Sequence, residues 1–274
     1  MKPKLNKYVK PILDIAILTA GRVDLFSKCV DAVLAQMQPE FRIHVCNNGH
    51  PSPEYEAVYE KLPHDAVIKR VNVDNGFGAG ANTAINSGSA PLVLFITDDV
   101  FIHEGAIMQL LETMQDESIG LCGLKLLFPE DSTETSRPAG RVQHIGMAAD
   151  IRGNMTHPLI GWKSDNPRCN ISREVLAVTG ATFMVRRNAF NQVRGFDPIY
   201  GMGYYEDMDL CMKIRSLSNR GQRSRIYIDT KAVGTHGVAQ TFKNEKAPPP
   251  MQQNTSIFKT RWFQFLEWTE YEFF

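Results

Sequence analysis

Short apolar runs alternate with segments of helical spacing over the first hundred residues, and this alternation limits the chain to few folds. Four runs rich in aliphatic and β-branched residues are expected to form strands, at residues 12–18, 42–46, 66–73 and 92–96. Helices are expected between them, at residues 24–34, 53–62 and 80–87, the first of them capped by Asp24. Strands that alternate with helices predict an α/β fold, in which a parallel sheet carries helices on both faces.

Each of these predicted strands ends in polar or glycine residues, at positions 19–22, 47–48, 74–76 and 98–99. In open α/β sheets the ligand binds beyond the carboxyl ends of the strands, at the point where the strand order reverses. We therefore expect the four strand ends to converge on one ligand site.

The pattern changes after about residue 120. Further strands are expected at residues 120–128, 142–151 and 225–229, and helices at residues 188–193 and 210–217. Three prolines at positions 248–250 precede a C-terminal aromatic segment, residues 258–274. We expect this segment to fold back onto the core; contact with an acceptor, a second subunit or a membrane surface is the alternative.

Composition excludes several classes of protein. The net charge is zero, so the chain has no overall basic field for nucleic acid or acidic membranes. No apolar run approaches the roughly 18 residues needed to span a bilayer, and the basic start lacks the apolar stretch of a signal peptide. The five cysteines are scattered and show no zinc-binding spacing. Reduced, mostly buried thiols in a cytoplasmic protein are expected.

Three carboxylates lie within four positions just before the helix expected at residues 210–217: Glu206, Asp207 and Asp209. The helix dipole favours acids at a helix start, where they can be held near a reacting group. Ordinary capping of a solvated helix is the alternative role.

Two further motifs follow predicted strands. Asp98 and Asp99 follow an apolar strand directly, and acids placed there can hold a divalent cation that neutralises a diphosphate; a hydrogen-bonded turn is the alternative. Residues 74–82 form a glycine-rich stretch that enters a helix, where backbone amides can approach phosphate or ribose. Its spacing is neither that of a Walker loop nor that of a Rossmann fingerprint.

Together these motifs resemble the inverting family 2 glycosyltransferases of GT-A fold, especially the rhamnosyl- and galactofuranosyltransferase-like branch. Four of them match in the family's order: Leu18-Thr19 with Arg22, residues 75–82, residues 97–100, and residues 179–181 through 195–197 to 206–210. The resemblance covers about residues 12–240. It implies the GT-A fold, an α/β fold whose central sheet is mixed but mostly parallel and flanked by helices. It also implies a nucleotide-sugar donor, a divalent metal (Mn or Mg), and direct displacement at the anomeric carbon with inversion.

The resemblance also implies roles for individual residues. Asp207 would be the catalytic base that deprotonates an acceptor hydroxyl, and Glu206 the second choice or an orienting group. Asp99 and His236 would bind the metal. The residues expected to bind the donor are Thr19, Ala20, Arg22, Asn47, Asn75, Gly76, Gly80, Asn82, Thr97, Asp98 and Gly180.

On this resemblance, residues 1–245 would be the catalytic domain, with a nucleotide-binding half at about 12–100 and an acceptor and catalytic half at about 101–245. Residues 246–274 would be a C-terminal aromatic tail, through which a homo-oligomer could form.

Two positions depart from the family pattern. Thr97 replaces the first acid of the Asp-x-Asp motif, which leaves more of the metal binding to Asp99. Asn47 stands where the family often has the acid that recognises the nucleobase, so the base is left open, since an amide can both donate and accept. The sugar and the acceptor, whether glycan, lipid-linked sugar, protein, small molecule or modified nucleobase, are left open as well.

Two other functions compete with a glycosyltransferase. A sugar-phosphate nucleotidyltransferase would need a basic, glycine-rich loop right after the first strand, where this chain has only residues 19–22. A catalytically inactive, nucleotide-sugar-binding scaffold is favoured slightly by Thr97 and disfavoured by the intact Glu206, Asp207 and His236.

Overall fold

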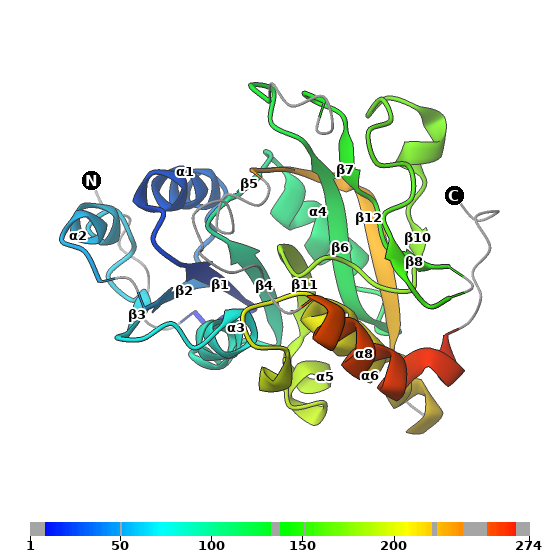
Figure 1. Cartoon of the computed structure of the whole chain (residues 1–274). Helices are drawn as coiled ribbons and strands as arrows, with labels where there is room; N and C mark the ends of the chain where they lie inside the picture. Colours follow the sequence, from blue (N-terminus) through cyan, green and yellow to red (C-terminus); the bar gives the residue numbers. More distant parts are fainter. Residues whose placement is uncertain are drawn as a thin grey trace.

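The computed structural model describes residues 9–49, 51–132, 138–150, 152–220, 224–237 and 251–266 (Figure 1). Its strands are β1 (Leu13–Thr19), β2 (Phe41–Asn48), β3 (Val67–Val71), β4 (Leu92–Thr97), β5 (Val100–Ile102), β6 (Ile119–Leu127), β7 (Val142–His144), β8 (Ala148–Ala149), β9 (Met155–Thr156), β10 (Arg173–Glu174), β11 (Thr182–Arg186) and β12 (Arg225–His236). Its α-helices are α1 (Val23–Leu34), α2 (Glu54–Tyr59), α3 (Phe77–Asn86), α4 (Ala106–Thr113), α5 (Arg187–Gln192), α6 (Glu206–Ser216) and α8 (Met251–Trp262).

One large sheet forms the centre, with the strand order β10-β12-β6-β11-β4-β1-β2-β3. Strands β3, β2, β1 and β4 run parallel, β11 runs antiparallel to both β4 and β6, and β12 runs parallel to β6. The chain order reverses at β1, which lies between β2 and β4. The predicted mixed but mostly parallel α/β sheet is confirmed.

The sheet separates two apolar cores, because successive residues of a strand point to opposite faces. In β1, Ile15 and Ile17 belong to one core, whereas Ala16 and Leu18 belong to the other. Helices α1, α2 and α4 supply the first core and α3, α5, α6 and α8 the second (Figure 1). Burial of both faces explains why these strands read as nearly continuous apolar runs.

The elements predicted for the first hundred residues are all present, with ends shifted by a few positions, but two details are wrong. Asp24 lies inside the first turn of α1 and does not cap it. Helix α3 begins at Phe77 and not at residue 80, so Gly78 is helical as well as Gly80. A Cβ on Gly80 would lie 2.7 Å from Leu18 Cδ1, which indicates that this glycine allows α3 to pack closely on β1.

Three predictions for the second half are also corrected. The strand expected at residues 142–151 ends at His144, because Gly146 adopts a φ of 107° that turns the chain; residue 151 lies outside the described residues. Helix α6 begins at Glu206 and not at residue 210. Strand β12 does not stop at residue 229 but continues to His236, so the histidine reaches the site on a strand and not on a loop.

The prediction that the C-terminal aromatic segment folds back is confirmed for its described part, residues 258–266. Phe258 of α8 is completely buried in the core that contains α6 (Figure 1). The prolines at 248–250 and Trp268 lie outside the described residues. None of the helices in the described part of the chain combines the length and the apolar character that crossing a bilayer requires.

Candidate functional site

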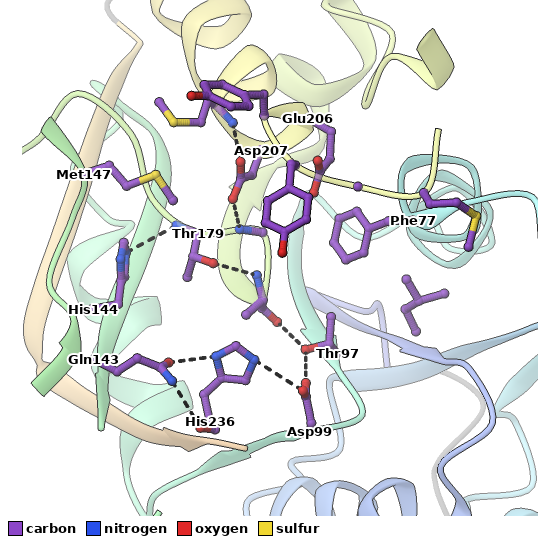
Figure 2. A pocket seen from close by; sticks show the side chains of 18 of the residues that line it. Phe77, Thr97, Asp99, Gln143, His144, Met147, Thr179, Glu206, Asp207 and His236 are labelled. Atoms are coloured by element: carbon purple, nitrogen blue, oxygen red, sulfur yellow. Dashed lines mark hydrogen bonds and ion pairs between the residues drawn. The ribbon is translucent and has the colours of Figure 1, made fainter. Parts of the chain in front are cut away.

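A cavity of about 830 Å³ opens where β1 and β4 end, at the reversal of the strand order (Figure 2). Its wall is formed by the ends of these strands, by the turn at residues 179–181, by the start of α6 and by His236 of β12. Segments far apart in the sequence thus meet around one space.

The start of α6 carries Asp207 on the wall of this cavity. Asp207 Oδ2 accepts the backbone N–H of Gly180 at 2.9 Å, and Oδ1 accepts that of Met208 at 2.8 Å (Figure 2). Gly180 lacks a side chain, and a Cβ there would lie 3.1 Å from Asp207 Cβ and 3.2 Å from the ring of Phe77. Burial raises the pKa of Asp207, although the two backbone N–H groups oppose the rise.

Glu206 lies beside Asp207 with its carboxyl group buried. Its Oε2 has no hydrogen-bond partner among the described residues, although the residue lines the cavity. Burial, and then the charge of Asp207, raise the pKa of Glu206 well above its ordinary value. A buried, unpaired carboxyl oxygen in a cavity wall is suited to bind a polar group of a ligand.

A second set of polar side chains faces the cavity at the end of β4. Asp99 Oδ1 accepts the hydroxyl of Thr97 at 2.7 Å, and Asp99 Oδ2 lies 3.4 Å from His236 Nε2 (Figure 2). His236 Nδ1 lies 2.7 Å from Gln143 Oε1, and Gln143 Nε2 donates to the backbone oxygen of His236. Gln143 therefore fixes a proton on Nδ1 and leaves Nε2 facing Asp99.

The neighbouring carboxyl groups of Asp98 and Asp99, after β4, have pKa values shifted in opposite directions. Burial works to raise the pKa of Asp99, but the charge and hydrogen bond of His236 and the hydroxyl of Thr97 bring it down to about 2. Burial and the charge of Asp99 raise the pKa of Asp98 to about 7. Asp98 Oδ2 accepts the hydroxyl of Thr19 at 2.6 Å and the backbone N–H of Ala20 at 3.1 Å, so this carboxyl ties β4 to the end of β1.

The residues predicted to form the site fall into two groups. The structure brings eight of them into the wall of the cavity: Ala20, Thr97, Asp98, Asp99, Gly180, Glu206, Asp207 and His236. Seven predicted donor-binding residues do not line it: Thr19, Arg22, Asn47, Asn75, Gly76, Gly80 and Asn82. Asn82 instead donates to the backbone oxygen of Phe196 and accepts its N–H, both at 2.9 Å, and so joins α3 to the segment before α6.

Strand parity explains why Asn47 lies away from the cavity. Its amide donates to the hydroxyl of Tyr59 at 3.1 Å, on the face covered by α2. Asn48, one residue later, points to the opposite face, lines the cavity and donates to Asp74 at 2.7 Å. Of the two residues at this strand end, Asn48 therefore faces the cavity and Asn47 does not.

Several cavity residues have no counterpart in the sequence predictions: Gln143, His144, Met147, Met155 and His157. They belong to the short strands and turns at residues 142–157, which show no clear periodicity. The pairing of Gln143 with His236 spans 93 positions, so no local pattern signals it.

Helix α8 supports the loop that directly precedes Glu206 at the start of α6. The amide of Asn254, which is buried, donates to the backbone oxygens of Tyr200, Gly203 and Tyr204 at 2.7–3.1 Å. Tyr204 and Tyr205 have φ values of 72° and 73°, a backbone conformation that residues other than glycine rarely adopt. The loop is therefore strained, and α8 holds it in the shape from which α6 begins.

The cavity wall is acidic. Five carboxyl groups line it, those of Asp74, Asp98, Asp99, Glu206 and Asp207. Among the residues that the structure describes, no lysine or arginine lines it. A polyanionic ligand would bind to such a wall only together with a cation.

Comparison with known proteins gives consistent matches. Residues 14–194 match the family model "Glycosyl transferase family 2". The O-antigen biosynthesis protein RfbC of Myxococcus xanthus is 30% identical over 198 residues, 68% of this chain and 15% of RfbC. The uncharacterized protein y4gI of Sinorhizobium fredii is 23% identical over 215 residues, 75% of this chain and 23% of y4gI. The chain thus spans less than a quarter of the length of either relative.

Solved structures share the fold at low sequence identity. GalNAc-T7, solved with UDP, GalNAc and Mn²⁺, has a TM-score of 0.71 at 12% identity, over 92% of this chain and 49% of that one. Staphylococcus aureus TarS with UDP-GlcNAc has a TM-score of 0.61 at 13% identity, over 95% and 69%. The mannosyltransferase PcManGT of Pyrobaculum calidifontis, solved with GDP-Man and Mn²⁺, has a TM-score of 0.58 at 12% identity, over 93% and 71%.

Proposed function

The chain belongs to glycosyl transferase family 2, and from this membership and the geometry of the cavity we propose that it is an inverting glycosyltransferase. It would move a sugar from a nucleotide-diphosphate donor to an acceptor hydroxyl, with Asp207 as the general base. The observation that carries the proposal is the position of Asp207, held by two backbone N–H groups in the wall that also contains Asp99 and His236.

Asp207 has the properties of a base for a hydroxyl. Each of its oxygens accepts one backbone N–H and retains a second lone pair, so the carboxylate is oriented but can still take a proton. Its raised pKa makes it more basic than an ordinary aspartate. As the acceptor oxygen bonds to the anomeric carbon, its proton passes to Asp207 and the bond from that carbon to the diphosphate breaks.

Glu206 would orient the donor sugar. Glu206 and Phe77 lie to the same side of Asp207 in Figure 2, toward α3 and the half of the sheet that contains β1 and β2. The unpaired Oε2 of Glu206 would form a hydrogen bond with a sugar hydroxyl there. This assignment makes Glu206 a binding residue and leaves proton transfer to Asp207.

The residues at the end of β4 fit a divalent cation, Mn²⁺ or Mg²⁺. Asp99 supplies a carboxylate, and Gln143 orients His236 so that Nε2 faces that carboxylate. No group of three or more potential metal-binding side chains occurs within the described ranges, so the remaining ligands would come from the donor diphosphate and water. When bound, the cation would neutralise the charge that develops on the departing diphosphate.

The acidic wall supports the same proposal independently. A diphosphate placed beside the ionised carboxylate of Asp99 would be repelled unless a cation lay between them. The relatives GalNAc-T7 and PcManGT were solved with Mn²⁺ together with UDP and GDP-Man, which supports both a metal and a nucleotide-sugar donor. The five free, buried cysteines support a reducing compartment, the cytoplasm.

The competing functions are weaker. A nucleotidyltransferase is disfavoured by the family match and by the absence of a basic glycine-rich loop after β1, where Arg22 is the only basic residue in the turn that precedes α1. A scaffold that binds a nucleotide sugar without transferring the sugar differs from the proposed enzyme only in turnover. The two functions are therefore distinguished by an assay of donor hydrolysis.

The test is a thermal-shift screen with UDP-, dTDP-, GDP- and CMP-sugars, each with and without Mn²⁺, followed by assay of donor hydrolysis. A ligand that binds the native state raises the unfolding temperature. We expect a shift for one nucleotide class that requires Mn²⁺, together with slow release of the nucleoside diphosphate. The absence of any shift would refute the proposal, and a shift without hydrolysis would support the scaffold.

A further inference from the structure

Two histidines on the cavity wall form a hydrogen-bonded pair that the proposed reaction does not use. His144, at the end of β7, is buried, and its Nδ1 lies 3.1 Å from Nδ1 of His157. His144 Nε2 accepts the backbone N–H groups of Gly146 and Thr179, each at 3.3 Å. Both histidines line the cavity, and His157 follows β9 directly.

The backbone determines where the protons of this pair lie. Because an N–H group can only donate, His144 Nε2 must be unprotonated and its proton must be on Nδ1. That proton is donated to His157 Nδ1, so His157 carries its own proton on Nε2. Each ring is therefore neutral, in agreement with a pKa of His144 that burial lowers well below its ordinary value.

The Nε2–H group of His157 donates to no acceptor among the described residues. The side chain of His157 is exposed at the cavity. A neutral donor with a fixed tautomer suits an uncharged oxygen, such as a hydroxyl group. The acidic wall reinforces this preference, because a carboxylate or phosphate ligand would be repelled by Asp207, which must be ionised to act as the base.

The histidine pair and Glu206 lie on opposite sides of the base. His144 and Met147 lie to one side of Asp207 in Figure 2, and Phe77 and Glu206 lie to the other. Thr179, which donates to His144, directly precedes Gly180, which donates to Asp207. The same turn thus positions the base and the histidine pair.

We propose that His157, held by His144, binds a hydroxyl group of the acceptor, and that the acceptor is an uncharged saccharide. The proposal rests on the glycosyltransferase function proposed above. The apolar side chains of Met147 and Met155 beside the pair would contact the C–H face of the sugar ring. His157 would thereby position the acceptor hydroxyl that Asp207 deprotonates.

The test uses the whole chain and a panel of methyl glycosides. The neutral probes are those of glucose, galactose, mannose and N-acetylglucosamine; methyl glucuronide and methyl galacturonide are their charged counterparts. Binding is followed by saturation-transfer NMR, and the histidine tautomers by long-range ¹H–¹⁵N spectra. His157→Ala, His157→Gln and the exposed control His64→Ala are compared with wild type.

We expect His157 to carry its proton on Nε2 and to shift when a neutral glycoside binds. His157→Ala should weaken that glycoside about tenfold, the value of one lost hydrogen bond. His157→Gln, whose amide can donate in place of Nε2, should restore part of the affinity, and His64→Ala should have no effect. Tighter binding of the uronides, a proton on His157 Nδ1, an unaffected alanine variant or no binding by any glycoside would each overturn the proposal.

Nucleotide binding measured on the same samples distinguishes the two proposals. If UDP-, dTDP-, GDP- and CMP-sugars all fail to bind in the presence of Mn²⁺, the proposed function fails. If one of them binds and the neutral glycosides do not, only the acceptor proposal fails.

Discussion

The indole Nε1 of Trp262 donates a hydrogen bond of 2.8 Å to Asp209 Oδ1 and so joins α8 to α6. Asp209 is completely buried, and the same oxygen also accepts the hydroxyl of Tyr200 and Nη1 of Arg261, each at 3.2 Å. Asp209 lies two residues after Asp207, so the C-terminal segment supports the helix that carries the proposed base.

Replacing Trp262 by phenylalanine should destabilise the fold. The aromatic packing is largely kept, but a buried carboxylate loses one donor, which costs about 1–3 kcal/mol in the free energy of unfolding. This loss of stability is measured by urea denaturation, with circular dichroism as the signal of unfolding. Trp162→Phe is the matched control, because Trp162 is exposed to 39% and contacts Arg168 only across its ring face. Equal effects of the two substitutions would contradict a structural role for the Trp262 indole.

Asn254→Ala should impair turnover more than donor binding. The substitution leaves three carbonyl groups of the loop at residues 200–204 without their donor, and the positive φ values of Tyr204 and Tyr205 favour relaxation of that loop. We expect kcat to fall at least tenfold, with the donor affinity changed by less than about threefold. Thr255→Ala is the control, since its hydroxyl bonds only within α8. An equal loss of kcat and donor affinity would show that α8 acts on the whole cavity.

The acid limb of the pH–rate profile should lie above the pKa of an ordinary aspartate. Asp207 acts as a base only when ionised, and burial raises its pKa above the usual 3.8. Activity is therefore present above the raised pKa and lost as the pH falls through it. Because Glu206 adjoins Asp207, the two carboxyl groups titrate together, and the acid limb reports an apparent pKa of the pair. Measurement of kcat/KM against pH, with Asp207→Asn as the comparison, tests this; a limb that persists unchanged in the variant would exclude Asp207 as the base.

The α/β sheet is predicted correctly from the sequence because apolar strands buried on both faces, with polar residues at their ends, are visible as local patterns. The GT-A fold follows from the resemblance to family 2 glycosyltransferases. The motif residues Asp99, His236 and Asp207 do lie on one cavity. Which of Asn47 and Asn48 faces that cavity depends on strand parity, which the sequence prediction did not follow to the last residue of β2. The His144–His157 pair depends on a turn and a short hairpin stabilised by distant contacts, for which no periodic signal exists.

Gln143→Leu should weaken the response of donor binding to Mn²⁺. Leucine removes the acceptor of His236 Nδ1 and so frees the orientation of the ring that faces Asp99. Loss of such a supporting hydrogen bond lowers metal affinity about 10- to 100-fold. Titration of Mn²⁺ at a fixed concentration of nucleotide sugar measures the change. Gln109→Leu, at a glutamine that bonds Asp229 away from the cavity, is the control; an unchanged Mn²⁺ requirement in Gln143→Leu would argue against His236 as a ligand.

Asp98→Asn should stabilise the metal-free protein, and more so at high pH. The unfolded chain releases this proton near pH 3.8, whereas the folded protein keeps it to about pH 7. The folded state therefore binds more protons in this window, and wild-type stability falls as the pH rises through it. Asparagine cannot ionise, and its amide oxygen can still accept from Thr19 and Ala20. We expect the variant to exceed wild type at pH 8.5 by about 1–3 kcal/mol more than at pH 5, measured by urea denaturation with a chelator. Asp165→Asn, at an exposed aspartate, serves as the control. If the difference between Asp98→Asn and wild type were the same at both pH values, Asp98 would be ionised throughout, and its bond to Thr19 would be that of a charged carboxylate.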